Sequence, residues 1–79
     1  MLSEIQHREL IQNIFIPYKY NVTSVNCNFI TGVIYIFVEK INYYTTIPNL
    51  ALKNAGYEVI TVLDAFESVV IKCKLLKRT

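Results

Sequence analysis

Histidine, cysteine and carboxylate side chains are the groups that could do chemistry in this chain, and they are few. The single histidine is His7, and the two cysteines, Cys27 and Cys73, form no C-x-x-C pair. A zinc site needs three or four closely spaced ligands of this kind, so no metal site is expected. The chain has only two glycines, too few for a loop that cradles phosphate.

The remaining combinations of reactive residues also predict structural roles. His7 falls within the apolar face of an expected helix, where a packed histidine is commoner than a general base with a positioned partner. Nothing near Cys27 or His7 supplies an activated thiolate, and Cys73 has the pattern of a small core residue. Asp64 and Glu67 share a turn, but two carboxylates do not satisfy a calcium ion. We therefore expect a non-enzymatic protein with no cofactor and no small-molecule substrate.

Two helices are expected to position the rest of the chain. Ser3 and Gln6 form a capping box before an amphipathic helix over residues 4–15, and Pro17 ends it. A second, shorter helix is expected over residues 46–55. It has Thr45 or Thr46 as a cap, Pro48 in its first turn and Gly56 as its left-handed stop.

Four strands follow from runs of β-branched and aromatic residues. They are expected over residues 22–28, 33–39, 57–63 and 68–76. Thr31-Gly32 and the segment 64–67 carry the turn residues that separate the members of each pair. Val33–Glu39 is apolar on both faces, which is typical of a strand covered on both sides. Phe29 and Phe66 lie at the two hairpin tips, where each is expected to fold back over the end of its hairpin.

The chain contains an internal sequence repeat. Residues 20–40 and 57–77 agree at 7 of 21 positions without a gap. The repeat predicts one α-β-β unit used twice, over residues 4–40 and 46–77, within a single domain 1–79. The expected fold is α+β: a two-layer sandwich with a four-stranded antiparallel sheet and two helices on one of its faces.

Composition indicates a protein that needs a partner. Hydrophobic residues make up 53% of the chain and charged residues 18%, which is more apolar surface than so small a core can hide. The longest apolar run, Val33–Val38, is too short to span a membrane. We expect an intracellular protein, because no secretory signal is apparent. The abundance of Ile, Asn, Tyr and Lys is typical of AT-rich genomes, such as those of viruses, plasmids or thermophilic archaea. For a viral protein, the host cytoplasm is expected.

The repeat also predicts which side chains lie on which face of the sheet. Six residues are expected to face the helices: Ile34, Ile36, Val38, Ile71, Cys73 and Leu75. Their neighbours are expected on the bare side, here called the outer face: Val33, Tyr35, Phe37, Val70, Lys72 and Lys74.

Two functions fit such an outer face. The favoured one is a homodimer interface centred on Val33, Tyr35, Phe37 and Val70, with both lysines at its rim. The alternative is a nucleic-acid-binding surface, with bases stacked on the aromatics and phosphates neutralised by lysine, extended by Lys77 and Arg78 in the basic terminal stretch. A third interpretation is that the chain's own tail or loops cover Tyr35 and Phe37.

Overall fold

A computed structural model describes residues 2–18, 20–39, 47–64 and 68–76 of the chain. Two α-helices, a short 3₁₀ helix and four strands follow one another along it. In order they are α1 (Glu4–Phe15), η1 (Ile16–Tyr18), β1 (Val22–Asn28), β2 (Val33–Glu39), α2 (Asn49–Asn54), β3 (Tyr57–Asp64) and β4 (Ser68–Leu75).

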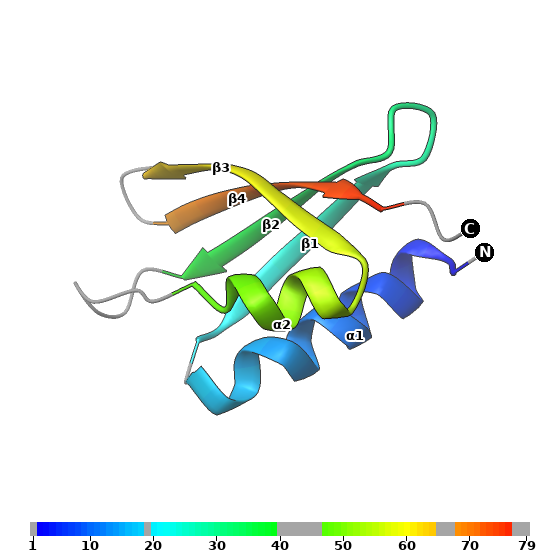
Figure 1. Cartoon of the computed structure of the whole chain (residues 1–79). Coiled ribbons are helices and arrows are strands. Elements are labelled where there is room, and N and C mark those ends of the chain that lie inside the picture. The colour runs from blue at the N-terminus through cyan, green and yellow to red at the C-terminus, as the bar shows by residue number, and fades with distance from the viewer. Residues whose placement is uncertain (1, 19, 40–46, 65–67, 77–79) are drawn as a thin grey trace.

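The four strands form one antiparallel sheet in the order β1-β2-β4-β3. Figure 1 shows α1 and α2 side by side beneath the same face of this sheet. The arrangement confirms the expected α+β class with two layers. It also places the last strand of each unit at the centre and the first strand of each unit at an edge. The order suits a duplicated unit, although duplication itself stays a prediction.

Helix α1 begins and ends as its sequence predicts. Ser3 Oγ accepts the Gln6 N–H at 3.2 Å, and Gln6 Oε1 accepts the Ser3 N–H at 2.8 Å. These bonds satisfy backbone donors that the first turn otherwise leaves open. After Phe15 the chain tightens into η1, which contains Pro17. No helix in the described part of the chain is long and apolar enough to cross a membrane.

Helix α2 is shorter than expected. It covers six residues rather than residues 46–55, and Pro48 stands just before it, at the N-cap, instead of in its first turn. A proline has no hydroxyl or amide side chain, and no side-chain hydrogen bond caps this helix. Thr45 and Thr46, the expected caps, lie outside the described residues. The predicted stop is confirmed, because Gly56 takes a φ of 101°.

The core lies between the helices and the sheet. From α1 it takes Ile11 and Phe15, and from α2 it takes Leu52, all almost fully buried. The strands complete it from their helix-facing side. Five of the six predicted core positions are buried: Ile34, Ile36, Val38, Ile71 and Cys73. The sixth, Leu75, is partly buried and packs against them. The two faces of the sheet are therefore assigned as predicted.

Candidate functional site

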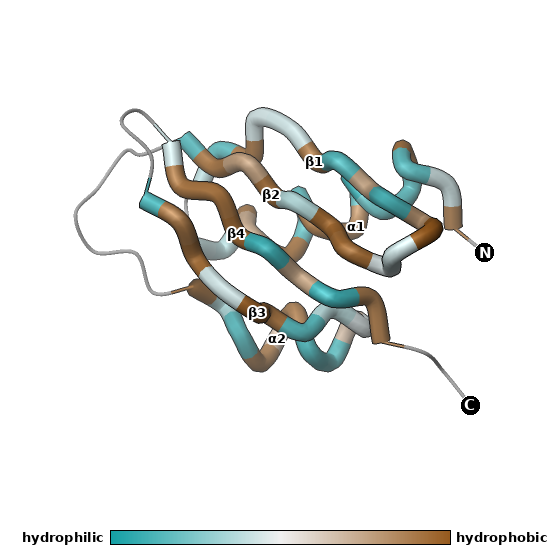
Figure 2. Tube along the Cα trace, turned by 90° about the horizontal axis from the view of Figure 1, so that it is seen from above, coloured by the Kyte–Doolittle hydropathy of each residue, from teal (hydrophilic) through white to brown (hydrophobic). Residues whose placement is uncertain are grey.

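The outer face of the sheet is the candidate site. Figure 2 looks onto this face, with α1 and α2 behind it. Cross-strand pairing arranges its side chains in rows, because residues directly opposite each other in antiparallel strands point to the same side. The three rows, read from β1 through β2 and β4 to β3, are Ser24-Phe37-Val70-Leu63, Asn26-Tyr35-Lys72-Thr61 and Asn28-Val33-Lys74-Glu58.

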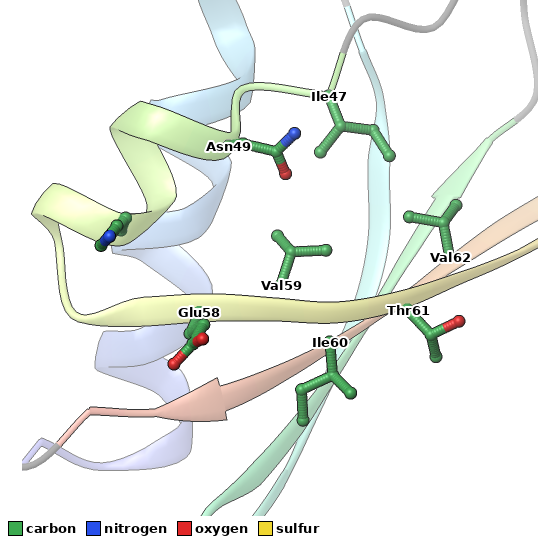
Figure 3. A pocket seen from close by; sticks show the side chains of 8 residues that line it. Ile47, Asn49, Glu58, Val59, Ile60, Thr61 and Val62 are labelled. Atoms are coloured by element: carbon green, nitrogen blue, oxygen red, sulfur yellow. The ribbon is translucent and has the colours of Figure 1, made fainter.

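The first row forms an apolar stripe across three strands. Phe37 lies opposite Val70, and Val70 lies opposite Leu63. Phe37 and Val70 are partly buried by their neighbours, whereas Leu63 is 54% exposed. Further along β3, next to Thr61 of the second row, Ile60 is 51% exposed and points away from the helices, as Figure 3 shows. Among the described residues, no helix lies over this end of the outer face.

The second and third rows are polar and basic. Lys72 lies between Tyr35 on β2 and Thr61 on β3, in the middle of the sheet. Its expected place at the rim of an interface stays a prediction. Lys74 lies opposite Glu58 near the end of its strand and is exposed. The outer face thus changes from apolar at one end to charged at the other.

Two exposed apolar residues of this surface, Ile60 and Leu63, were missed by the sequence-based prediction. Strand β3 has a bulge between Val59 and Thr61, where the pairing register with β4 shifts by one residue. The bulge turns Ile60 and Thr61 to the same side. Leu63 could have been found from the repeat, which aligns it with Asn26 of the outer face, but nothing local marks the bulge.

Lys77 and Arg78, the predicted extension of a nucleic-acid surface, lie outside the described residues, as does Phe66 at the second hairpin tip. At the first tip, Phe29 lies near α1 but remains 42% exposed. Its ring centroid lies 5.8 Å from that of His7.

His7 is buried beneath the sheet and serves the core. Its side chain is 3% exposed, and Nδ1 lies 2.5 Å from the hydroxyl of Tyr57, which is itself 1% exposed. Burial lowers the pKa of His7 and raises that of Tyr57 to about 12, because both charged forms lose hydration. Nε2 is buried and has no hydrogen-bond partner among the described residues. The pair joins α1 to β3 as neutral groups, which supports a structural role.

Neither cysteine is an activated nucleophile. Both are free thiols, Cys73 in the core and Cys27 partly buried on β1. Burial raises the pKa of Cys73 to about 12, and burial together with the Glu4 carboxylate raises the pKa of Cys27. A raised pKa leaves less thiolate at neutral pH. The Glu4 carboxylate accepts the Cys27 backbone N–H at 3.0 Å.

The described residues hold no group of three or more His, Cys, Asp or Glu side chains that could bind a metal ion. One open groove of about 420 Å³ lies between α2 and β3 and is lined by Ile47, Asn49, Lys53, Glu58, Val59, Ile60, Thr61 and Val62. Its lining contains no histidine or cysteine.

Comparison with known proteins found no match for this chain among protein-family models, curated proteins or solved structures.

Proposed function

We propose that this protein is a non-enzymatic interaction protein that forms a homodimer through the outer face of its sheet. The observation that carries the proposal is the row Phe37-Val70-Leu63, an apolar stripe that no described element covers. Apolar patches of this kind on small domains usually mark interfaces. Burying the stripe would also add a second hydrophobic layer to a domain whose own core is small.

The position of the stripe suggests where the twofold axis lies. Homodimers commonly place one patch against itself. An axis near Phe37 and Val70 would bring the two stripes together and move Lys74 toward the periphery of the contact. Lys72 would lie between these extremes, where its long side chain can carry the ammonium group to solvent while its methylenes cover apolar surface.

Sedimentation of matched variants tests the dimer. Phe37→Glu places a charge in the centre of the stripe, and we expect the variant to sediment at a lower mass than the wild type at the same concentration, because the outer-face contact is lost. The control is Asn26→Glu, which puts the same charge at an exposed position on the polar side of the same face. It should keep the sedimentation mass of the wild type. Equal masses for the wild type and Phe37→Glu at every concentration would reject this interface.

A second function, binding of single-stranded nucleic acid, is favoured by one separate observation. Tyr35 lies directly opposite Lys72 at the middle of the sheet, and Asn26 lies opposite Tyr35 on the other side. A ring for base stacking therefore stands between a cation and an amide, the combination used by sheets that bind single strands. Lys74 extends the positive charge along β4.

Fluorescence anisotropy with short DNA and RNA strands tests this second function. If it holds, Tyr35→Leu should weaken binding about tenfold through lost stacking. Lys72→Gln should reduce the slope of log affinity against log salt concentration by about one, as expected for the loss of one phosphate contact. Absence of binding to any strand at low salt would reject it.

We also infer that the protein acts inside a cell and that its two α-β-β units arose by duplication. The free thiols of Cys27 and Cys73 are typical of a reducing compartment. The 7 matched positions of 21 and the outer and inner places of corresponding strands support the duplication. An origin in a virus or mobile element rests on composition alone.

A further inference from the structure

The two edge strands of the sheet differ in what contacts their free edges. On β1, the Cys27 N–H donates to the carboxylate of Glu4 from α1, so a helix side chain occupies this edge. On β3, every residue from Ile60 to Asp64 is exposed, and five apolar or hydroxyl residues, 59–63, stand between Glu58 and Asp64. Edge strands present backbone N–H and C=O groups sideways, and a long apolar edge strand is a template for another strand.

We propose that the β3 edge pairs with β3 of a second copy of this chain, antiparallel, to extend the sheet across the contact. Backbone hydrogen bonds would supply the attraction, as in other cases of strand addition. The proposal concerns the edge of the sheet and is independent of the dimer proposed through the outer face.

The bulge in β3 argues that the occupant is a second copy. Figure 3 shows Val59 and Val62 on the α2 side of the strand, while Ile60 and Thr61 point to the opposite side. The break in alternation makes the face pattern of β3 symmetrical about the Ile60–Thr61 bond. If a regularly alternating strand paired with β3, its side chains would point to the same side as their opposite neighbours on β3 only before or only after this break. A second β3 carries the same break, and it matches every face when Val59 lies opposite the partner's Val62.

The groove beside β3 fits this register. Its lining joins Ile47, Asn49 and Lys53 of the α2 region to Val59 and Val62 of the strand, and its volume is about 420 Å³. In the proposed pairing, Val62 of each copy lies opposite Val59 and enters the groove of the other. Val62 is 41% exposed in the single chain, and this contact would bury it together with the apolar lining.

The charges at the ends of β3 permit the antiparallel arrangement. Lys53 and Glu58 line one end of the groove, so that end carries no net charge. In the antiparallel pair, this end of one β3 would lie beside the Asp64 end of the partner's β3. The ammonium group of Lys53 would then be near both carboxylates. The axis of such a pair is perpendicular to the sheet, so the outer faces of both copies remain on one side and stay accessible.

Disulfide trapping tests the register. The pairing places Glu58 opposite the partner's Leu63, whereas Glu58 and its own counterpart are about 17 Å apart along the strands, at about 3.4 Å per residue. Glu58→Cys and Leu63→Cys proteins should therefore form a mixed disulfide on mixing under mild oxidation, identified by its mass. The Glu58→Cys protein alone should form none, and the wild type controls for Cys27 and Cys73. No mixed disulfide at any concentration would overturn the proposal.

A charge in the groove provides the second test. Val62→Lys, introduced into both cysteine proteins, should abolish the mixed disulfide, while Asn26→Lys on the β1 edge should leave its yield unchanged. An undiminished yield with Val62→Lys would overturn the proposal. Phe37→Glu should also leave the yield unchanged, so failure of the outer-face dimer and failure of edge pairing are separately visible. Circular dichroism of each variant confirms that it is folded.

Discussion

The two α-β-β units of this protein share an order of elements but differ in the capping of their helices and in the exposure of their edge strands. In the first unit, α1 has 12 residues and a full capping box, and its Glu4 occupies the free edge of β1. In the second unit, α2 has six residues and no side-chain cap, and most of β3 is exposed beside it. The first unit is therefore the more completely capped and covered, while the second leaves most of its first strand exposed.

The units are also joined unequally. His7 of α1 reaches across to Tyr57 of β3, and this buried hydrogen bond links residues 50 positions apart. Thus the first helix helps to fix the start of the open strand. Beyond its first residue, β3 has little burial of its own. An exposed strand held firmly at one end is well suited to receive another strand.

The largest effect should come from removing the core of the first helix. Phe15 is 1% exposed, and Phe15→Ala should lower the free energy of unfolding by about 3–5 kcal/mol through lost transfer energy and a cavity. Leu50→Ala on the exposed side of α2 should cost less than about 0.5 kcal/mol. Urea denaturation measures both. A loss below about 1 kcal/mol for Phe15→Ala would mean that α1 does not anchor the fold.

Breaking the link between the units should have the next largest effect. Tyr57→Phe removes the hydroxyl from His7 Nδ1 and leaves both ring nitrogens buried without a partner, at a cost of about 1–3 kcal/mol. Tyr18→Phe, at an exposed tyrosine, should be nearly neutral. Equal unfolding free energies for the two variants would show that the His7–Tyr57 bond contributes nothing net.

The same pair predicts a pH dependence. Burial lowers the pKa of His7 below its ordinary value of 6.5, so the unfolded chain binds a proton more readily than the folded chain. The stabilisation is complete above pH 6.5 and is lost as the pH falls from there toward the lowered pKa. Unfolding free energies measured from pH 8 to pH 5 should decrease for the wild type. His7→Leu should lack the histidine part of this slope, and an identical slope in both would contradict the assignment.

The smallest effect concerns the reactivity of Cys27 on β1, the edge strand that Glu4 contacts. Glu4 raises the pKa of Cys27 as well as accepting its N–H, so Glu4→Gln should lower that pKa and speed alkylation of Cys27 by iodoacetamide at pH 8. The gain should be below about tenfold, because burial is the larger cause of the raised pKa. Glu9→Gln, on the exposed side of α1, is the matched control and should not change the rate. Cys73 should stay unmodified, and no difference between the two variants would place Glu4 away from the β1 edge.

Local pattern accounts for much of this fold and long-range contact for the rest. The capping box at Ser3, the left-handed Gly56 and the alternation in Val33–Glu39 each act within a few residues, so the sequence predicts them. Strand order does not follow from local pattern, and it decides that Lys72 lies at the middle of the outer face.

The candidate site was predicted only in part for the same reason. Its six predicted residues lie on β2 and β4, whose alternation is regular. The bulge that turns Ile60 outward interrupts alternation without a glycine or proline to mark it. The Glu4 contact with Cys27 spans 23 residues and depends on how α1 packs, so no pattern in the sequence indicates that one edge is closed and the other open.

Equilibrium sedimentation of the wild-type protein over a wide range of concentrations, at low and high salt, tests the central claim that the open surfaces of this chain bind other copies of it. The account predicts an average mass above the 9.2 kDa of one chain that rises with concentration. It also predicts that this mass persists at high salt, because the proposed contacts are largely apolar and salt screens charges only. A mass of 9.2 kDa at every concentration and both salt levels would contradict it.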